Sequence, residues 1–300
     1  MLTLLLACAP TAPPRGPAPP PSSGPVRFVA IGDTGRNTPE QTAVAAAMGR
    51  ICAHRTCDFA LLLGDNLYPK GMETDDDPRM TAVFTDVYGD LGLEFMAVLG
   101  NHDYGGGEAV RALRQLRFAA KTPTFTMPDR YYTFDRGAAS FFALDTDWVF
   151  FNGEEEQAAW LDTKLAASDA RWKVAFGHHP WRSNGKHGNA GTYEGWGWVP
   201  YVSGNALRRL FEGHVRAADL YVSGHDHNLQ VMRHEGVPLV VSGGGSSARG
   251  FEDRGNPLDL GFAVPGFAWI ELDEVLKVAL YDENGTLLGE QTYPHPREVP

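Results

Sequence analysis

The sequence predicts a layered α/β fold, in which helices cover a mixed sheet or a pair of sheets. Two observations predict it. Short apolar segments of strand length alternate along the chain with longer segments whose apolar residues recur at helical spacing. From Val26 onward, no Pro/Ser-rich linker and no block of like charge interrupts this alternation. We therefore expect one domain over residues 26–300, preceded by a distinct segment over residues 1–25.

The first predicted helix carries its own start signal. Thr38 is placed as its N-cap, Pro39 occupies the first turn, and Gln41 is expected to close a capping box with Thr38. The other predicted helices are Thr81–Tyr88, Glu108–Phe118, Glu155–Ala167 and Asn205–Phe211. The predicted strands are Val26–Ile31, Phe59–Leu63, Phe95–Leu99, Tyr131–Phe134, Phe141–Leu144, Lys173–Phe176, Leu220–Val222, Leu239–Val241, Ala268–Leu272 and Val275–Tyr281.

Residues 1–25 have the composition of an export signal followed by a tether. The run Leu5-Leu6-Ala7-Cys8 resembles a bacterial lipobox, in which the cysteine is lipidated and becomes the mature N-terminus. The Pro-rich segment Thr11–Pro25 is typical of a semi-extended tether. We expect an exported bacterial protein, either periplasmic or anchored to a membrane by a lipid on Cys8. A basic n-region is absent and the apolar run is short, so either the true start lies upstream or the match is accidental.

The charge balance disfavours nucleic acid as a partner. The chain has 37 acidic and 26 basic residues and a formal net charge of −11. Proteins that bind nucleic acid neutralise phosphates with clustered Lys and Arg, and this sequence has no such cluster. An anionic substrate would therefore need another local source of positive charge, such as bound metal.

Two cysteines remain once Cys8 is assigned to the tether. Cys52 and Cys57 are separated by four residues. In an oxidising compartment they would close a small disulfide loop, whereas two reduced thiols at a helix end fit the spacing equally well. The sequence leaves both alternatives open.

Five predicted strands end in the same way, with a glycine followed by residues of metal-ligand type. Ligands in α/β folds bind where loops leave the carboxyl ends of strands, and glycine there permits a sharp turn. A single Gly-Asp after a strand is usually a turn, and a lone histidine is usually packed or on the surface, but five such endings together indicate a shared site. The five endings are Gly32-Asp33, Gly64-Asp65-Asn66-Leu67-Tyr68, Gly100-Asn101-His102-Asp103, Gly177-His178-His179 and Gly224-His225-Asp226-His227.

Four histidines lie outside this pattern. His54, His214, His234 and His295 are not part of a strand ending, and we interpret them as ordinary packed or surface residues.

In order and in content, the five motifs resemble those of the metallophosphoesterases. They are most similar to the small, single-domain purple acid phosphatases related to tartrate-resistant acid phosphatase. The resemblance covers roughly residues 26–290. It implies a layered α-β-β-α sandwich with mixed sheets and an acid phosphatase that hydrolyses phosphate monoesters of small molecules by attack of a metal-bound hydroxide. Independently of the resemblance, we expect a monomer.

Two positions favour the purple branch of this superfamily. Most relatives carry Asp-x-His at the first strand end, and here Gly35 stands where that histidine would be. In the purple enzymes a tyrosine three residues after the bridging aspartate supplies the replacement ligand, and Tyr68 matches that position. A phenolate is a hard anionic donor, so it favours Fe(III) over zinc.

The resemblance implies two metal sites that share one carboxylate. Asp65 would bridge them, as suits metals about 3.5–4 Å apart. The oxygen-rich first site suits Fe(III), and the histidine-rich second site suits Fe(II), Zn(II) or Mn(II). The first set is Asp33, Asp65, Tyr68 and His227, and the second set is Asp65, Asn101, His178 and His225.

Two further histidines are expected to serve the substrate. By resemblance, His102 and His187 would bind the phosphoryl oxygens or protonate the leaving alkoxide. For His187 the alternative is an ordinary loop histidine within Ser183–Gly197. His179 replaces a tyrosine common in close relatives. The loop that contains Trp196 and Trp198 could form one wall of the substrate site. The simpler interpretation is that its aromatic side chains pack against the protein and hold the loop in place.

Two other functions stay open at this point. One is a Mn- or Zn-dependent phosphodiesterase acting on small phosphodiesters, against which Tyr68 and the missing first-motif histidine argue. The other is a secreted binding protein that keeps the fold without catalysis, against which the complete ligand set argues. A Gly-rich segment, Gly243–Ser247, gives only a weak indication of anion binding by backbone N–H groups.

Overall fold

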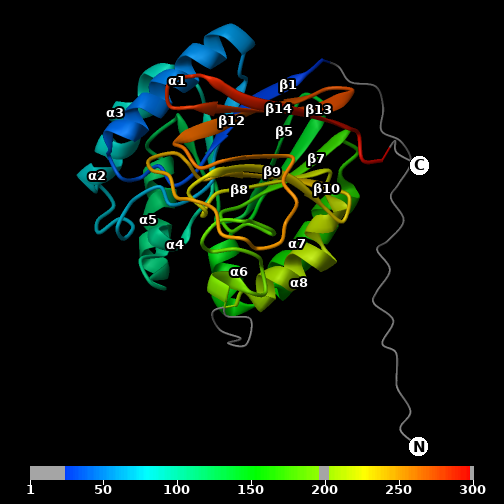
Figure 1. Ribbon diagram of the computed structural model, residues 1–300. Helices are drawn as coiled ribbons and strands as arrows, with labels where there is room; N and C mark the ends of the chain where they lie inside the picture. Colours follow the sequence, from blue (N-terminus) through cyan, green and yellow to red (C-terminus); the bar gives the residue numbers. More distant parts are fainter. Residues whose placement is uncertain (1–23, 196–202, 298–300) are drawn as a thin grey trace, which may run out of the picture.

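The fold is built on two seven-stranded mixed sheets (Figure 1). The computed structural model describes residues 24–195 and 203–297. The first sheet has the order β14-β13-β12-β1-β2-β3-β4 and the second the order β11-β9-β10-β8-β7-β6-β5. The strands of the first sheet are β1 (Val26–Ile31), β2 (Phe59–Leu62), β3 (Phe95–Ala97), β4 (Phe125–Thr126), β12 (Gly266–Leu272), β13 (Val275–Asp282) and β14 (Leu287–Pro294). Those of the second are β5 (Tyr132–Arg136), β6 (Ala139–Ala143), β7 (Trp172–Phe176), β8 (Leu220–Ser223), β9 (Leu229–His234), β10 (Val237–Ser242) and β11 (Leu260–Phe262).

Helices cover the outer faces of both sheets, which confirms the predicted α-β-β-α order of layers (Figure 1). The first sheet carries α1, α3 and α5, and the second carries α6, α7 and α8. The helices are α1 (Pro39–Arg55), α2 (Pro78–Met80), α3 (Asp86–Tyr88), α4 (Asn101–Tyr104), α5 (Ala109–Ala119), α6 (Thr146–Asn152), α7 (Glu155–Ala167) and α8 (Asn205–Gly213).

Aromatic side chains join the two sheets face to face. Phe28 of β1 and Phe59 of β2 stack on each other, and Phe141 of β6 meets both rings edge-on from the opposite sheet, at centroid distances of 5.4 and 5.2 Å. All three side chains are fully buried. Such edge-to-face contacts stabilise the packing beyond the burial of apolar area alone. The sandwich core therefore fixes how the strand ends of one sheet lie against those of the other.

Two predicted local features differ in detail from the structure. Thr38 caps α1 as expected, accepting from the N–H of Gln41 at 3.2 Å. The Gln41 side chain, however, accepts from the N–H of Asn37 and donates to the carbonyl of Val83, so it does not close the capping box on Thr38. The predicted helix Thr81–Tyr88 belongs to a longer helical segment that starts at Pro78 and contains a π-helical turn over Thr81–Thr85.

The strands that carry the predicted ligands point the same way. β1, β2 and β3 are parallel, as are β7 and β8 in the other sheet. Backbone hydrogen bonds join the sheets at the carboxyl ends: the N–H of Gly32 donates to Ser242 and the N–H of Gly245 donates to Gly32, at 2.8 and 3.1 Å. All five ligand-bearing loops therefore leave the sandwich at one edge.

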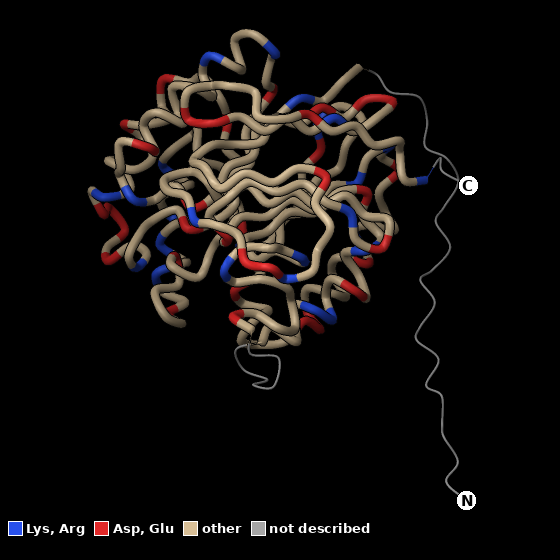
Figure 2. Tube along the Cα trace, viewed as in Figure 1, with Lys and Arg blue, Asp and Glu red and all other residues tan. Residues whose placement is uncertain are grey.

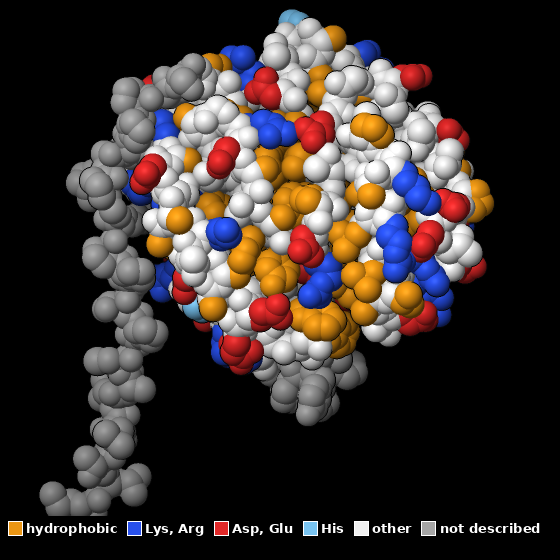
Figure 3. Space-filling view, turned by 180° about the vertical axis from the view of Figure 1, so that it is seen from behind, with side chains coloured by type: hydrophobic (Ala, Val, Ile, Leu, Met, Phe, Trp, Pro, Cys, Tyr) orange, Lys and Arg blue, Asp and Glu red, His pale blue; other side chains and the backbone are white. Residues whose placement is uncertain are grey.

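The surface shows charges of both signs. Lys and Arg alternate with Asp and Glu along the loops and helices, while the central strands carry few charged residues (Figure 2). On the opposite face, basic side chains are interspersed with acidic ones around a band of hydrophobic side chains (Figure 3). This distribution is consistent with the sequence-based argument against a nucleic-acid surface.

The cysteine pair left open by the sequence forms a disulfide. The Cys52 and Cys57 sulfurs are bonded at the end of α1. Cys8, residues 11–23 of the predicted tether, and Trp196 and Trp198 lie outside the described residues. In the described parts of the chain, no helix combines the length and apolar character needed to cross a membrane.

Candidate metal centre

The seven predicted metal ligands form one continuous cluster at the shared edge of the two sheets. They come from the loops after β1, β2, β3, β7 and β8, and each of them has a donor atom within 3.5 Å of another. The donor atoms of Asp33, Asp65 and His178 all lie within 4.8 Å of one another, and these three side chains are buried. The spacing is that of groups that can converge on metal ions.

Three donor atoms gather around the Tyr68 hydroxyl. It contacts Asp65 Oδ2 at 2.7 Å, Asp33 Oδ1 at 3.1 Å and His227 Nε2 at 3.3 Å. His227 Nε2 also lies 3.4 Å from Asp33 Oδ1. These atoms are the first predicted ligand set, which we call the oxygen-rich group. Its three oxygen donors to one nitrogen suit a hard, highly charged cation.

The other donors gather around His178. Its Nε2 contacts Asn101 Oδ1 at 3.1 Å, His225 Nδ1 at 3.0 Å and Asp65 Oδ1 at 3.5 Å. These atoms are the second predicted set, the histidine-rich group. Asp65 therefore presents one carboxylate oxygen to each group, as a bridging ligand must.

Strained backbone supports the functional interpretation. Asp33, Asp65 and His225 have φ values of 59°, 54° and 68°, in the left-handed region that side chains with a Cβ seldom adopt. Such residues cost on the order of 1–3 kcal/mol each and concentrate at functional sites. Three donors of one cluster share this conformation, which aims their side chains inward at the expense of stability.

Gly35 explains how Tyr68 enters the cluster. A Cβ at Gly35 would lie 2.3 Å from the backbone carbon of Asn66, so no side chain fits there. Its carbonyl accepts from the N–H of Tyr68 at 2.9 Å. The absence of a side chain at position 35 thus lets the loop after β2 pack close and place the phenol among the carboxylates.

Hydrogen bonds outside the cluster fix the orientation of two histidines. His178 Nδ1 lies 2.9 Å from the Leu63 carbonyl, so Nδ1 carries the proton and Nε2 faces the cluster as a lone-pair donor. His227 Nδ1 lies 2.8 Å from the Ser247 hydroxyl, and its Nε2 also faces inward. Metal-ligating histidines are typically held in this way by a partner at the other ring nitrogen.

Electrostatics show that the cluster resists ionisation of its tyrosine in the absence of cations. Burial and the nearby Asp33 and Asp65 carboxylates raise the pKa of Tyr68 well above its usual value. Burial would raise the pKa of Asp33, but the neighbouring His227 and His178 hold it below its usual range. Burial would lower the pKa of His178, yet Asp65 and Asp33 raise it. A bound cation would reverse the effect of the carboxylates on Tyr68 and stabilise its phenolate.

Sequence reasoning did not assign roles to three residues that hold the ligand loops. Asp103 accepts from the N–H groups of Asn66 and Gly100 and from the Gln115 side chain, and so ties the loops after β2 and β3 together. Asp226 accepts from the Ser183 hydroxyl and the N–H of His187. Thr146 Oγ1 accepts from the N–H groups of His178 and His179. Asp226 lies between the predicted ligands His225 and His227, and Asp103 follows the predicted ligand Asn101 by two residues, so both belong to the strand-end motifs.

The two predicted substrate histidines flank the cluster. His102 Nδ1 donates to the Pro69 carbonyl at 2.7 Å, and its Nε2 lies 3.9 Å from Asp65 Oδ2. The His187 ring lies 4.1 Å from that of His225, and its Nδ1 bonds Glu194. Both side chains keep part of their surface exposed, 36% for His102 and 19% for His187. Both rings are therefore partly open to solvent beside the cluster.

The remaining sequence features have structural roles. His179 is buried, bonds Thr146 through Nδ1 and stacks on Phe150, and burial lowers its pKa well below the usual value. The Gly-rich segment 243–247 supports the ligands: the Ser246 hydroxyl donates to the Asp33 carbonyl, and Ser247 orients His227. The segment is therefore a brace for the cluster. Its backbone N–H groups at Gly243 and Gly245 are occupied by bonds within the protein.

Comparisons with known proteins agree with this geometry. Residues 26–229 match the calcineurin-like phosphoesterase family. The chain is 31% identical over 294 residues to purple acid phosphatase 4 of Arabidopsis thaliana, covering 88% of this chain and 82% of that protein. It is 27% identical over 299 residues to human tartrate-resistant acid phosphatase type 5, covering 86% and 87%.

Solved structures share the fold. A purple acid phosphatase from yellow lupin seeds matches with a TM-score of 0.67 and 18% identity, over 92% of this chain and 55% of the lupin chain. GAP50, the anchor in the inner membrane complex of Plasmodium, matches with a TM-score of 0.73 and 22% identity, over 90% and 89%.

Proposed function

Because the chain belongs to the calcineurin-like phosphoesterases, and within them to the purple acid phosphatases, we propose that it is a two-metal acid phosphatase that hydrolyses phosphate monoesters. One observation carries the proposal. Seven donors from five strand ends converge in two groups that share Asp65, with one carboxylate oxygen directed to each group. Buried carboxylates, histidines and a phenol at these distances can hold two cations that share one carboxylate.

We propose Fe(III) for the oxygen-rich group and Fe(II), Zn(II) or Mn(II) for the histidine-rich group. Asp33, Asp65 and Tyr68 supply three hard oxygens beside one nitrogen of His227. His178 and His225 supply softer nitrogens beside the oxygens of Asn101 and Asp65. When bound, the two cations would attract the phosphoryl oxygens and acidify a water molecule for attack on phosphorus.

The chain's own residues account for the remaining requirements. His102 is held through Nδ1 by the Pro69 carbonyl, which directs Nε2 toward the space above Asp65. A proton on Nε2 can then pass to the leaving oxygen, and His187 on the opposite flank can bind a phosphoryl oxygen. The buried position of Asp65 and His178 excludes bulk water from the floor of the site.

The experiment is a paired turnover assay on natively purified protein. We expect hydrolysis of 4-nitrophenyl phosphate at acidic pH, loss of activity on chelation, and recovery on adding Fe together with Zn or Mn. Turnover of bis(4-nitrophenyl) phosphate at a higher rate than the monoester would favour the phosphodiesterase alternative. Absence of turnover for both esters with two metals bound would favour a binding role for the fold.

We also propose that the protein is exported and tethered through Cys8. The Cys52–Cys57 disulfide supports this, because such bonds persist in oxidising compartments. Cell fractionation should find the protein with membranes or in the periplasm, and Cys8→Ser should move the membrane-bound fraction into the soluble fraction. A cytoplasmic protein whose N-terminus is intact would contradict the proposal.

A further inference from the structure

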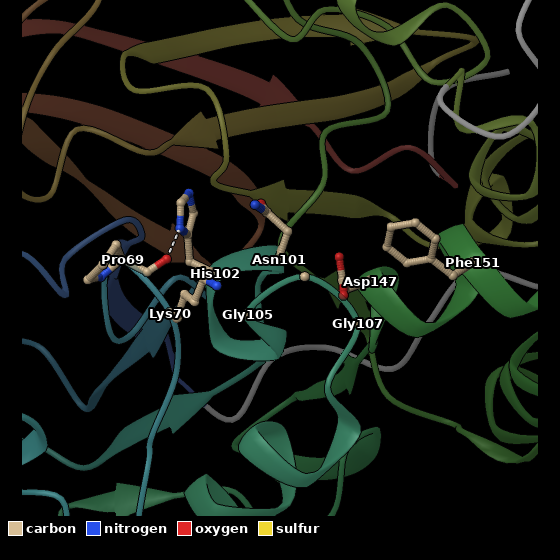
Figure 4. A pocket seen from close by; sticks show the side chains of 9 residues that line it. Pro69, Lys70, Asn101, His102, Gly105, Gly107, Asp147 and Phe151 are labelled. Carbon is tan, nitrogen blue, oxygen red and sulfur yellow. Dashed lines mark hydrogen bonds between the residues drawn. The ribbon is translucent and has the colours of Figure 1, made fainter.

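A pocket extends from the metal cluster along the sandwich edge. It has a volume of about 310 Å³ and is lined by Asn101 and His102 at one end and by Asp147 and Phe151 of α6 at the other (Figure 4). A volume of this size lies at the lower end of the range for small-molecule sites, so it fits a single ring better than a large ligand. Asn101 of the cluster and His102, whose Nε2 lies 3.9 Å from Asp65 Oδ2, both line the pocket, so a phosphate on the metals would place its alcohol part here.

Asp147 is the unusual member of this pocket. Its side chain is buried, with 2% of the residue exposed, and among the described residues its Oδ1 has no hydrogen-bond partner. A buried polar atom without a partner costs on the order of 1–3 kcal/mol. The nearby Asp145 gives a contrast, since its carboxylate is bonded to the Tyr104 hydroxyl, Arg130 and the N–H of Trp148. Asp145 holds the fold together, whereas Asp147 is kept at a cost that no contact in the described structure offsets.

Phe151 supplies the opposite kind of surface. It is the most exposed of the large apolar side chains described, at 65%. It stands one helical turn after Asp147, at i+4, so the two side chains share one face of α6. Figure 4 shows both projecting to the same side as Asn101 and His102. An exposed aromatic ring beside a catalytic centre is typical of a surface that binds another flat ring.

The rest of the lining leaves room for such a ligand. Gly105, Gly106 and Gly107 have positive φ values, and a Cβ at Gly106 or Gly107 would meet nothing within 4 Å. Crowding by the rest of the protein therefore does not explain the glycines at positions 106 and 107. A side chain at either position would project into the open space beside the pocket. Lys70 lines the same end as His102 and brings a positive charge to that end of the pocket.

We propose that this pocket is the subsite for the alcohol part of the substrate, and that it selects aromatic monoesters whose ring carries a hydroxyl group. This proposal rests on the phosphatase activity proposed above. Phe151 would stack on the ring, and the Asp147 carboxyl would bond the hydroxyl. Burial raises the pKa of Asp147 to about 8. A hydroxyl partner suits both protonation states, because it donates to a carboxylate and accepts from a carboxyl.

Phosphonates test the subsite by binding, independently of turnover. Methylphosphonate, benzylphosphonate and its 3- and 4-hydroxy derivatives would be titrated calorimetrically into the metal-loaded protein. We expect Phe151→Ala to weaken benzylphosphonate about three- to tenfold, the usual value of an aromatic contact, and to leave methylphosphonate unchanged. Leu287→Ala is the matched control, because Leu287 is a large apolar residue, 50% exposed, on the distant strand β14. It should change neither affinity.

A second pair of variants tests the hydroxyl contact. In the wild-type protein, the better of the two hydroxybenzyl compounds should bind a few-fold more tightly than benzylphosphonate. Asp147→Leu should abolish that preference, and Asp147→Asn, which keeps a donor and an acceptor, should retain part of it. Both replacements remove a buried ionisable group, so neither is expected to prevent folding.

The outcomes separate the subsite from the activity. The subsite proposal would be overturned if Phe151→Ala weakened the binding of methylphosphonate and benzylphosphonate equally. It would also be overturned if the wild-type protein bound the hydroxybenzyl compounds no more tightly than benzylphosphonate. Turnover of phenyl phosphate is measured in parallel. A wild-type protein that binds the aromatic phosphonates selectively but turns over no ester would contradict the phosphatase proposal while leaving the aromatic pocket in place.

Discussion

The metal cluster and the adjacent pocket share one edge of the sandwich but are built in opposite ways. In the cluster, Tyr68 and His178 each contact three other donors, and buried side chains press against one another. In the pocket, Asp147 Oδ1 is buried without a hydrogen-bond partner among the described residues, and the Phe151 ring faces solvent. The cluster rests on loops from both sheets, whereas the pocket is lined by the segments that follow β2 and β3 and, on its far side, by Asp147 and Phe151 of the short helix α6.

The difference shows how the two tasks are divided. Ligands for cations must be held rigidly by many contacts, because misplacement by an ångström weakens both binding and catalysis. A surface that selects a substrate needs unsatisfied groups that the substrate itself completes. We therefore expect substitutions in the cluster to abolish activity regardless of the substrate, and substitutions in the pocket to change which substrates are preferred.

The largest expected effect is at the residue the two groups share. Asp65→Ala removes one oxygen from each group, so both cations should be lost and turnover should fall by at least about a thousandfold. Elemental analysis and 4-nitrophenyl phosphate turnover on the same samples measure this. Asp76→Ala, at an exposed carboxylate paired with Lys121, is the control and should keep both metals and full activity. An Asp65→Ala protein that retains two metals would contradict the bridging role.

The next largest effect, at His102, separates the loss of substrate binding and protonation from the loss of metal. His102→Ala should lower turnover about a hundredfold, the usual value of a general acid, with metal content still near two per chain. Its side chain reaches Asp65 only at 3.9 Å, so no ligand bond is removed. His54→Ala, an exposed histidine of α1, should behave as wild type. A His102→Ala protein that loses metal but keeps its activity per remaining site would reverse this assignment.

A smaller effect concerns how the stability of the protein depends on pH through Asp147 in the pocket. Burial raises the pKa of Asp147 from an ordinary value of 3.8 to about 8, so between these values the folded state binds more protons than the unfolded state. The contribution of Asp147 to stability therefore falls as pH rises from about 4 to about 8. Relative to wild type, Asp147→Asn should gain up to about 1.4 kcal/mol per pH unit in this window, less where bound cations lower the pKa.

Denaturant unfolding at pH 5 and pH 7 measures that difference. The free energy of unfolding of Asp147→Asn should exceed that of wild type by more at pH 7 than at pH 5. Parallel pH profiles for the two proteins would show that the Asp147 carboxyl ionises normally, and would place it in contact with water or a partner in solution.

The metal ligands could be predicted from the sequence because each belongs to a short pattern of neighbouring residues. A short apolar strand, one glycine and a ligand-type residue form a pattern within eight positions, and the pattern at Gly64–Tyr68 contains both the bridging carboxylate and the phenol. The layer order also followed from periodicity together with the family resemblance. β9 and β14 were not predicted, since β9 follows His227 almost directly and β14 alternates weakly as an edge strand.

The residues that hold and extend the site could not be predicted, because their roles depend on distant contacts. Asp103 meets Asn66 across 37 positions, and Asp226 meets Ser183 across 43. Asp147 follows no strand-plus-glycine pattern, and nothing in its neighbourhood in the sequence distinguishes it from a first-turn acidic residue of α6. Its significance depends on burial without a partner, which only the packed structure reveals.

The most direct test of the two-metal account is the visible spectrum of the natively purified protein, measured with its metal content, in wild type and Tyr68→Phe. A phenolate bound to ferric iron absorbs visible light by transferring charge to the metal, whereas Zn(II) or Mn(II) with the same tyrosine does not. We predict about two metals per chain including iron, a pink to purple wild-type protein, and a variant without that colour whose oxygen-rich group binds iron more weakly. An iron-loaded, active wild-type protein without colour, or a Tyr68→Phe variant with an unchanged spectrum, would contradict the account.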